Sequence, residues 1–487
     1  MHFIYKLNTN MDTNGNIPFQ REKTFAESSL KHLLDKPLSA EFLPRKLRPL
    51  PKELSVKFGL PEDLCLMAIL SFASAHLGNA FQLGGRGEWA PGLGNLRFAL
   101  GTDREVDLTP LFRTLGSCLH KAEKHGFSEY ARNRAKPPTL EEQGTLMRES
   151  GEMLRNRKID INLRLQDTAR LTECFLGRTR PHVLLDDHIP EQWAEIAGES
   201  FSEKLFATSS RGVAVRKFLD GTLNEQQRES FLRIFRAGWV EESFKTRKGR
   251  SCWSFADKLS VGAFWALPSP LLRSALCDER MRSERLWESF LLTEVELEGG
   301  VAKIRTEDAL PSLGFWRKSM IDLHSARLNS AEPLVPIHCK ASEVFDQMAD
   351  ELNQALPQLS QEARSHVLDW NGIAYKIAGV LHLLEHGLHE MPLDEETATN
   401  ATSLVRRLGA RTLHTLESAV NSQQVRDDSE AERTMARKLK TKGPVSFQTL
   451  RRSYRKQAKS LHEPVLDSLQ RKKVVEIGED RLIRLVG

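Results

Sequence analysis

The stretch from Gly101 to Leu108 begins where a predicted strand ends in glycine, as a phosphate-binding loop does, but it lacks the other residues of such a loop. Such a loop reads G-x-x-x-x-G-K-[S/T]: backbone amides surround the phosphates, the lysine neutralises them and the hydroxyl binds Mg²⁺. Here Gly101 takes the first position, and Val106, Asp107 and Leu108 take those of the second glycine, the lysine and the hydroxyl. Asp107 would bring negative charge to the phosphates. If this stretch is a phosphate-binding loop, it is a degenerate nucleotide position, and ATP and Mg²⁺ bind only if the altered loop still holds them; an ordinary strand-to-helix turn is the alternative.

A second motif, H-x-x-E-H at His382, Glu385 and His386, is a zinc-peptidase signature in which two histidines share a helix face. A zinc site needs a third ligand, and the surrounding helix is strongly apolar and ends at Gly387. A histidine in the last turn of a helix is favoured by the helix dipole alone. We therefore expect no metal here, and we assign no catalytic residue and no required cofactor.

Positive charge is concentrated at the C-terminal end of the chain. From residue 431 to 487 there are 15 Lys and Arg against 6 Asp and Glu, whereas the whole chain has a net charge of +5. A concentrated cationic module is typical of contact with a polyanion, although the same side chains also suit a solvated surface. The candidate DNA-binding residues are Arg451, Arg452, Arg455, Lys456, Lys459, Arg471, Lys472 and Lys473.

The pattern of this module predicts three short helices followed by a β-hairpin. Met435 and Leu439 mark a first helix over 431–442, Ser446 can begin a second, and Leu466 and Leu469 mark a third. Two β-like runs, 474–477 and 482–485, close the chain. This order is that of a winged helix-turn-helix, which places its third helix in a DNA groove. Docking onto another protein is the alternative use of this fold.

Two further basic clusters lie in the remainder of the chain. The first contains Arg211, Arg216 and Lys217, and the second contains Lys245, Arg247, Lys248 and Arg250. A solvated face is the ordinary explanation for such clusters. If the body of the protein contacts DNA, these are its first candidates.

Length and composition limit the possible classes. The chain has 487 residues, 40% of them apolar, enough for two to four domains with substantial cores. No apolar run reaches the length of a membrane span, and the six cysteines form no C-x-x-C pair. We therefore expect a soluble cytoplasmic protein without a membrane partner.

Apolar runs predict strands at 96–100, 205–207 and 259–267 and a short strand or turn at 182–185. Periodic patterns predict helices after Pro61 and over 222–237 and 340–419. The polar stretch 421–430 suggests a linker. Strands alternating with helices predict an α/β fold.

Four stretches resemble the helicase-like P-loop family of phages, prophages and plasmids known as domain of unknown function 3987. They are Leu60 to Asp63, Trp89 to Gly101, Asp186 to Glu191 and Ile377 to His382. The resemblance implies a RecA-like, P-loop-type core with extensive helical additions and a C-terminal winged helix. It suggests an N-terminal arm and helical region over 1–80, the core over 81–335, a helical region over 336–425 and the winged helix over 431–487.

The chain departs from that family at each catalytic position that can be aligned. The acidic pair expected after a core strand falls at Ser209 and Ser210, and a Gln-Pro sensor falls at Leu267 and Pro268. An expected arginine falls near Ser289. Phosphoryl transfer depends on positioned cations and a metal, so the joint loss implies a scaffold that does not hydrolyse ATP.

These observations together predict a DNA-associated, helicase-like protein of a mobile element or prophage. It would act by binding or scaffolding in replication or element maintenance, with a replication or defence protein as a possible partner and oligomerisation open. Two alternatives remain at this point: an active ATPase or helicase with a non-standard nucleotide site, and a protein-interaction module that does not bind DNA.

Overall fold

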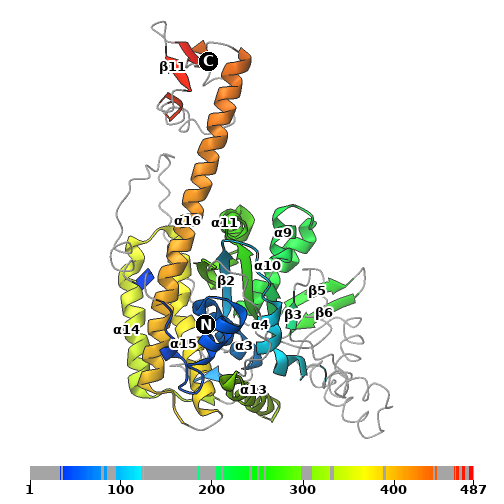
Figure 1. The fold of residues 1–487 in the computed structure, drawn as a ribbon, viewed down its shortest axis with the longest axis vertical. Helices are drawn as coiled ribbons and strands as arrows, with labels where there is room; N and C mark the ends of the chain where they lie inside the picture. The colour runs from blue at the N-terminus through cyan, green and yellow to red at the C-terminus, as the bar shows by residue number, and fades with distance from the viewer. Residues whose placement is uncertain are drawn as a thin grey trace, which may run out of the picture.

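The computed structural model describes residues 33–34, 37–77, 82–84, 95–121, 124, 184–186, 204–209, 212–240, 244–248, 252–256, 259–297, 310–329, 334–387, 391–442, 445–446, 466, 468–470, 474–477 and 482–485. The molecule has a mixed α/β body from which one long helix, α16 (Glu395–Lys442), rises to carry a small C-terminal module (Figure 1). The predicted α/β class of the body is confirmed.

A five-stranded sheet forms the centre of the body. Its strands are β2 (Arg97–Thr102), β3 (Leu184–Asp186), β4 (Lys204–Ser209), β7 (Ser260–Pro268) and β8 (Leu291–Val295). All neighbours pair in parallel, in the spatial order β3-β4-β7-β2-β8. The four predicted strands are confirmed, and β8 is a fifth that the apolar runs did not indicate.

The sheet is buried on both faces, as parallel sheets generally are. Alternate residues of one strand belong to different core clusters: Phe264 packs into one cluster and Trp265 into the other. Helix α3 (Glu62–Leu77) lies against β2, β4 and β7 on the first face, while α10 (Glu225–Val240) and α11 (Ser269–Cys277) contact β7 on the other. The helices predicted after Pro61 and over 222–237 are thereby confirmed.

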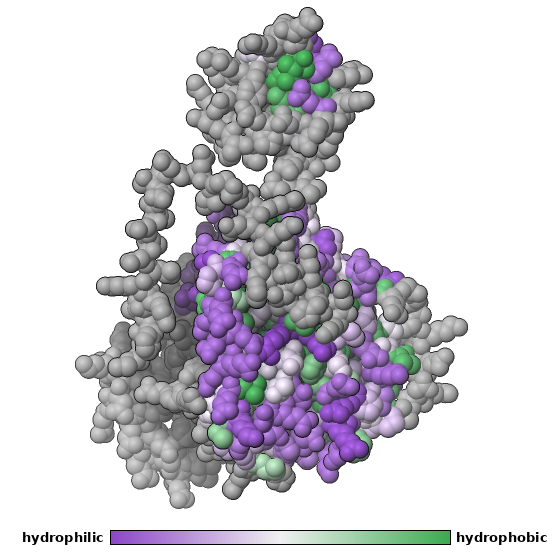
Figure 2. All heavy atoms as spheres, turned by 90° about the vertical axis from the view of Figure 1, so that its left-hand side faces the viewer, coloured by the Kyte–Doolittle hydropathy of each residue, from purple (hydrophilic) through white to green (hydrophobic). Residues whose placement is uncertain are grey.

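Further helices enlarge the first face of the body. Leu64, Phe98 and Ile377 share one continuous core, so the N-terminal helices, the sheet and the helices after residue 335 pack as a single unit. The larger helices are α2 (Leu50–Phe58), α13 (Pro311–Asn329), α14 (Cys339–Ala355) and α15 (Gln361–His386). Figure 2 shows the side of the body that bears α14; its described residues are largely hydrophilic, with apolar ones scattered among them.

Shorter elements complete the described part of the chain. They are η1 (Ala40–Phe42), α4 (Thr109–Leu115), α9 (Val213–Leu219), α12 (Glu279–Ser283), η3 (Trp287–Ser289) and η4 (Leu356–Gln358), the parallel pair β1 (Gln82–Leu83) and β9 (Leu334–Val335), and the antiparallel ribbon of β5 (Phe244–Lys248) and β6 (Cys252–Ala256).

Helix α16 covers the β8 edge of the sheet before it leaves the body. The Thr412 hydroxyl accepts a hydrogen bond from the Leu292 amide at 2.9 Å and lies 3.1 Å from the Leu292 carbonyl. These contacts satisfy backbone groups of β8 that an edge strand would otherwise expose. The part of α16 within the body is therefore fixed to the sheet itself, and we call the part that follows Ser422 the stalk.

The predicted linker over 421–430 is wrong, because these residues lie inside α16. No glycine or proline occurs from residue 410 to 442, so nothing in the backbone interrupts the helix. At 1.5 Å per residue, α16 is about 70 Å long, and about 30 Å of it follows Ser422. The predicted first helix of the module is the last part of this helix.

The C-terminal module has a small core and a three-stranded antiparallel sheet. Its strands are β10 (Val445–Ser446), β11 (Val475–Ile477) and β12 (Leu482–Leu485), in the order β10-β12-β11. The core joins Met435 and Leu439 of α16 to residues further on, namely Leu466, Leu469, Val475 and Ile483. The predicted hairpin is confirmed. Ser446 lies in a strand, and the second helix expected after it falls outside the described residues.

Among the described residues, no single helix combines the length and apolar character of a membrane span. Helices α2 and α3 reach those values only as a pair, across a bend of 118°. Leu64 and Phe72 of α3 belong to the central core of the body.

Candidate functional site

The carboxyl ends of parallel strands form the edge at which ligands usually bind in open α/β sheets. In this chain β2 leads at that edge into the loop 103–108 and then into α4. Gly101 lies within β2, one residue before its end. A Cβ on Gly101 would lie 2.9 Å from Ser269 Oγ and 3.1 Å from Glu294 Cγ, so the glycine allows α11 and β8 to approach the strand closely.

Acidic residues of the loop 103–108 are engaged with the protein itself. The Leu297 amide donates to Asp103 Oδ1 at 3.1 Å, and the Thr109 amide donates to Asp107 Oδ1 at 2.9 Å. Glu105 pairs with Arg216 of α9 at 2.6 Å. The loop thus presents carboxylates where a phosphate site would present a lysine and free amides.

Apolar side chains take the other two diagnostic positions of the loop. Leu108 is fully buried, and Val106 packs against the same core from a partly buried position. Neither can bind Mg²⁺ or a phosphate oxygen. The positions Gly101, Val106, Asp107 and Leu108 therefore lie at a strand-to-helix connection, and their side chains include neither a lysine nor a hydroxyl.

The end of β4, where the acidic pair of a motor protein was expected, holds a buried serine. Ser209 is buried, and its hydroxyl accepts a hydrogen bond from the Gly212 amide at 2.8 Å. Gly212 has φ of +63°, a conformation that favours glycine. Ser210 lies outside the described residues.

The residues at the positions expected for the sensor and the arginine of a motor protein also make contacts within the fold. Leu267 is buried, and its carbonyl accepts a hydrogen bond from the Thr102 hydroxyl at 3.2 Å, which ties β7 to β2. Pro268 leads into α11. Ser289 Oγ accepts a hydrogen bond from Arg97 Nη1 at 2.8 Å.

Arg97 is a buried cation that the sequence did not single out. Its other nitrogens donate to the carbonyls of Val261 at 2.8 Å and Phe235 at 2.6 Å, and its guanidinium lies over the Phe235 ring. Burial lowers the pKa of Arg97 to about 9. These partners come from three separate elements, so Arg97 joins them at the amino end of β2.

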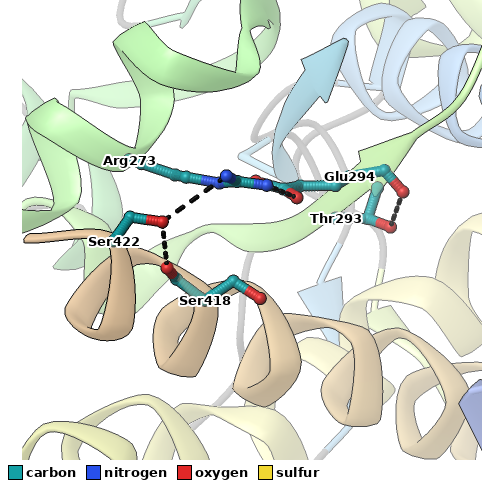
Figure 3. Close-up of polar contacts among 5 residues, drawn as sticks. All are labelled: Arg273, Thr293, Glu294, Ser418 and Ser422. Atoms are coloured by element: carbon teal, nitrogen blue, oxygen red, sulfur yellow. Dashed lines mark hydrogen bonds and ion pairs between the residues drawn. The ribbon is translucent and has the colours of Figure 1, made fainter. Parts of the chain in front are cut away.

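A second unforeseen cluster lies at the carboxyl edge (Figure 3). Arg273 of α11 donates from Nε and Nη2 to the two carboxylate oxygens of Glu294, at 2.7 and 2.5 Å. Its Nη1 also lies 3.5 Å from Ser422 Oγ on α16. The bonds to Glu294 raise the pKa of Arg273 above its usual value. This cluster joins the sheet edge to the base of the stalk, and its members are too far apart in the sequence to be recognised together.

The H-x-x-E-H motif ends α15, as predicted. His382 is buried, its Nε2 lies 3.1 Å from the Met391 carbonyl, and its ring is 4.9 Å from that of His386. Burial, and then the neighbouring His386, lower the pKa of His382. A cavity of about 300 Å³ nearby is lined by both Arg45 and Glu385. Within the described part of the chain, no three His, Cys, Asp or Glu residues are grouped to bind a metal.

The structure describes few of the predicted DNA-binding positions. The eight cations of the module, from Arg451 to Lys473, lie outside the described residues, as do Arg211 and Arg250. Arg216 is engaged by Glu105. Lys245, Arg247 and Lys248 lie on β5.

No family model matches this chain, and no curated protein is similar to it.

Proposed function

We propose that this protein is a DNA-binding, helicase-like scaffold of a mobile genetic element or prophage, built on a RecA-type core that does not hydrolyse ATP. The observation that carries the proposal is the loop 103–108. Its carboxylates are bonded to neighbouring groups, and Leu108 is buried in the core. Such a loop repels a triphosphate, has no lysine to neutralise it, and holds its carboxylates in bonds to the protein itself.

The order of the strands supports the RecA-type core. Numbered along the chain, the five strands lie in space as fifth, first, fourth, third and second. That is the order of RecA-type motor sheets, in which the phosphate loop follows the first strand. The loop 103–108 follows the first strand here, so its altered residues occupy the position where a motor would bind ATP.

The topology and charge of the module support DNA binding. In a winged helix a short strand after the first helix pairs with the last strand of the wing, as β10 pairs with β12 here. The core of the module also joins one helix, α16, to the hairpin. Its excess of nine positive charges suits a phosphate backbone.

The first test is nucleotide binding by the full chain. We expect no shift in melting temperature with ATP and Mg²⁺ at millimolar concentration, and no phosphate release with or without DNA. A triple variant, Val106→Gly with Asp107→Lys and Leu108→Ser, restores the missing residues of a phosphate-binding loop and is the comparison for nucleotide binding. ATP turnover by the unaltered chain that disappears in Asp107→Ala would refute the proposal.

The second test is binding to duplex DNA as salt is raised. Changing Arg451, Arg455 and Lys472 together to alanine should weaken affinity and reduce the salt slope by about 2.7, since each phosphate contact contributes about 0.9. Changing the exposed pair Arg317 and Lys318 on α13 is the control. If the module variant binds duplex as the unaltered chain does, with the same salt slope, the module does not bind DNA.

A further inference from the structure

A cavity of about 300 Å³ lies where the N-terminal segment 42–48 meets the corner between α15 and α16. Its other lining residues belong to the stretch 381–386 at the end of α15 and the stretch 394–400 at the start of α16. We call it the corner cavity. Ligand pockets range from about 300 to 1,000 Å³, so this volume suits a small molecule rather than a nucleotide cofactor.

Charges of opposite sign line the corner cavity from different parts of the chain. Arg45 and Arg48 come from the N-terminal segment. Three carboxylates come from the other elements: Glu385 from α15, and Asp394 and Glu396 from the start of α16. All five residues are exposed, and none of the ion pairs among the described residues joins the two groups. Both groups are therefore accessible to a ligand.

Hydrogen bonds hold the backbone on both sides of the corner cavity. The Arg48 amide donates to the Pro44 carbonyl at 3.1 Å, and Arg48 Nε donates to the Leu43 carbonyl at 3.1 Å. On the other side, the Thr397 amide donates to Asp394 Oδ1 at 2.8 Å. The charged groups are thus attached to backbone that is already ordered, which reduces the entropy lost when a ligand binds.

Apolar side chains complete the lining of the corner cavity. Phe42, Leu43 and Leu381 are buried there. The Phe42 ring is also covered by the guanidinium of Arg407, 4.8 Å from the centre of the ring. A cavity that combines apolar surface with charges of both signs suits a ligand with a methylene chain between charged ends.

We infer that the corner cavity binds a free α-amino acid with a cationic side chain, of the lysine or arginine class. The carboxylate of the ligand pairs with Arg45 and Arg48, because guanidinium groups bind carboxylates through paired hydrogen bonds. The α-ammonium and the side-chain cation pair with the carboxylates of the cavity, and the methylene chain lies on the apolar surface. Two arginines and three carboxylates leave the lining one negative charge in excess, which a ligand with one net positive charge neutralises.

Three other classes of ligand match this lining less well. The carboxylates repel a phosphate group. A metal ion finds no group of three His, Cys, Asp or Glu ligands among the described residues, and the two arginines repel it. A diamine leaves the arginines without a carboxylate to bind. No described residue of the C-terminal module lines the cavity, so the inference is separate from the proposed binding of DNA.

The ligand class is tested by isothermal titration calorimetry of the full chain with L-lysine and L-arginine. At least one of them should bind saturably, with one molecule per chain. L-norleucine has the chain of lysine without its side-chain ammonium, and cadaverine lacks its carboxylate. Each should bind at least about tenfold more weakly, because each loses charge-assisted hydrogen bonds. Absence of binding by both L-lysine and L-arginine at millimolar concentration overturns the inference, as does equally tight binding of norleucine or cadaverine.

The cationic side of the cavity is tested by Arg45→Gln. Arg45 is exposed and makes no side-chain hydrogen bond to another described residue, so the variant should fold and melt as the unaltered chain does. It should weaken binding of the amino acid by about tenfold or more. Arg317→Gln, which removes an exposed cation of α13, is the matched control. Unchanged affinity in Arg45→Gln, or an equal loss in Arg317→Gln, shows that the ligand is not held here.

The acidic side is tested by Glu385→Gln with Glu396→Gln. This variant should weaken L-lysine by about tenfold or more but should affect norleucine less, because norleucine has a single cationic group. The exposed pair Glu279 and Glu284, changed in the same way, is the control. If the Glu385 and Glu396 variant binds L-lysine as the unaltered chain does, the proposed recognition of the side-chain cation is wrong.

Discussion

Arg273 and Glu294 form a two-pronged ion pair across 21 residues of sequence, with N–O distances of 2.7 and 2.5 Å. The pair lies at the carboxyl edge of the sheet, beside Gly101, where a nucleotide would bind in an active motor. Since Arg273 also reaches Ser422 of α16, the edge is joined to the stalk. In this protein the edge therefore serves to hold structural elements together.

The first prediction concerns the strength of this pair. A double-mutant cycle with Arg273→Gln and Glu294→Gln should give a coupling free energy of about 1–2 kcal/mol in urea unfolding, because the pair is bidentate and partly buried. The pair of Arg282 and Glu362 is the control, since both side chains are nearly half exposed. Its coupling should stay below about 1 kcal/mol. Equal couplings in the two cycles would contradict the structural role.

The second prediction concerns the crossing of α15 and α16. A Cβ on Gly409 would lie 2.4 Å from Cη2 of the Trp370 ring, so only glycine permits this approach. Gly409→Ala should lower the free energy of unfolding by about 2–3 kcal/mol through overpacking.

Gly314→Ala on α13 is the matched control, because nothing lies within 4 Å of its added carbon. It should raise stability by about 0.5–1 kcal/mol through helix propensity. If Gly409→Ala proves as stable as Gly314→Ala, α15 and α16 do not cross as described.

The strands of the sheet could be predicted because burial on both faces requires continuous apolar runs. The run over 259–267 and the shorter one over 96–100 meet that requirement, and both became central strands, β7 and β2. The position of the loop 103–108 could be predicted for the same reason, since it follows from the strand before it.

The stalk could not be predicted from the same signal. A helix that spans the gap between two bodies is polar on all sides and has no apolar periodicity, so 421–430 resembled a linker. The absence of glycine and proline over 410–442 was the available sign of a continuous helix. Arg97 and Arg273 were missed because their partners lie far away in the sequence, as with Arg97 and Phe235, 138 residues apart.

The third prediction concerns pH. Burial lowers the pKa of His366 from 6.5 to about 4, and its Nδ1 has no hydrogen-bond partner among the described residues. Between these values the unfolded chain binds the proton and the folded chain does not. The contribution of His366 to stability is therefore full above pH 6.5 and is lost as pH falls to about 4, on the order of 3 kcal/mol.

His366→Leu removes this titration. The difference in unfolding free energy between the variant and the unaltered chain should change by that amount from pH 7 to pH 4, measured in urea. Carboxylates common to both proteins cancel in this difference. If the unfolding free energies of the variant and the unaltered chain change in parallel from pH 7 to pH 4, His366 is charged in the folded protein or accessible to water.

The fourth prediction concerns the continuity of the stalk. A continuous helix holds the C-terminal module at one distance from the body, because about 30 Å of helix follows Ser422. Val425→Pro breaks the helix between the body and the module. Small-angle X-ray scattering should report one extended particle for the unaltered chain and a range of shapes for the proline variant.

Val425→Ala, which preserves the helix, is the matched control, and circular dichroism reports the loss of helix in the proline variant. The alanine variant should scatter as the unaltered chain does. The proline variant should show a wider range of maximum dimensions, since a hinged connection samples many separations. Identical scattering from the proline variant and the unaltered chain would mean that the stalk does not set the distance between the body and the module.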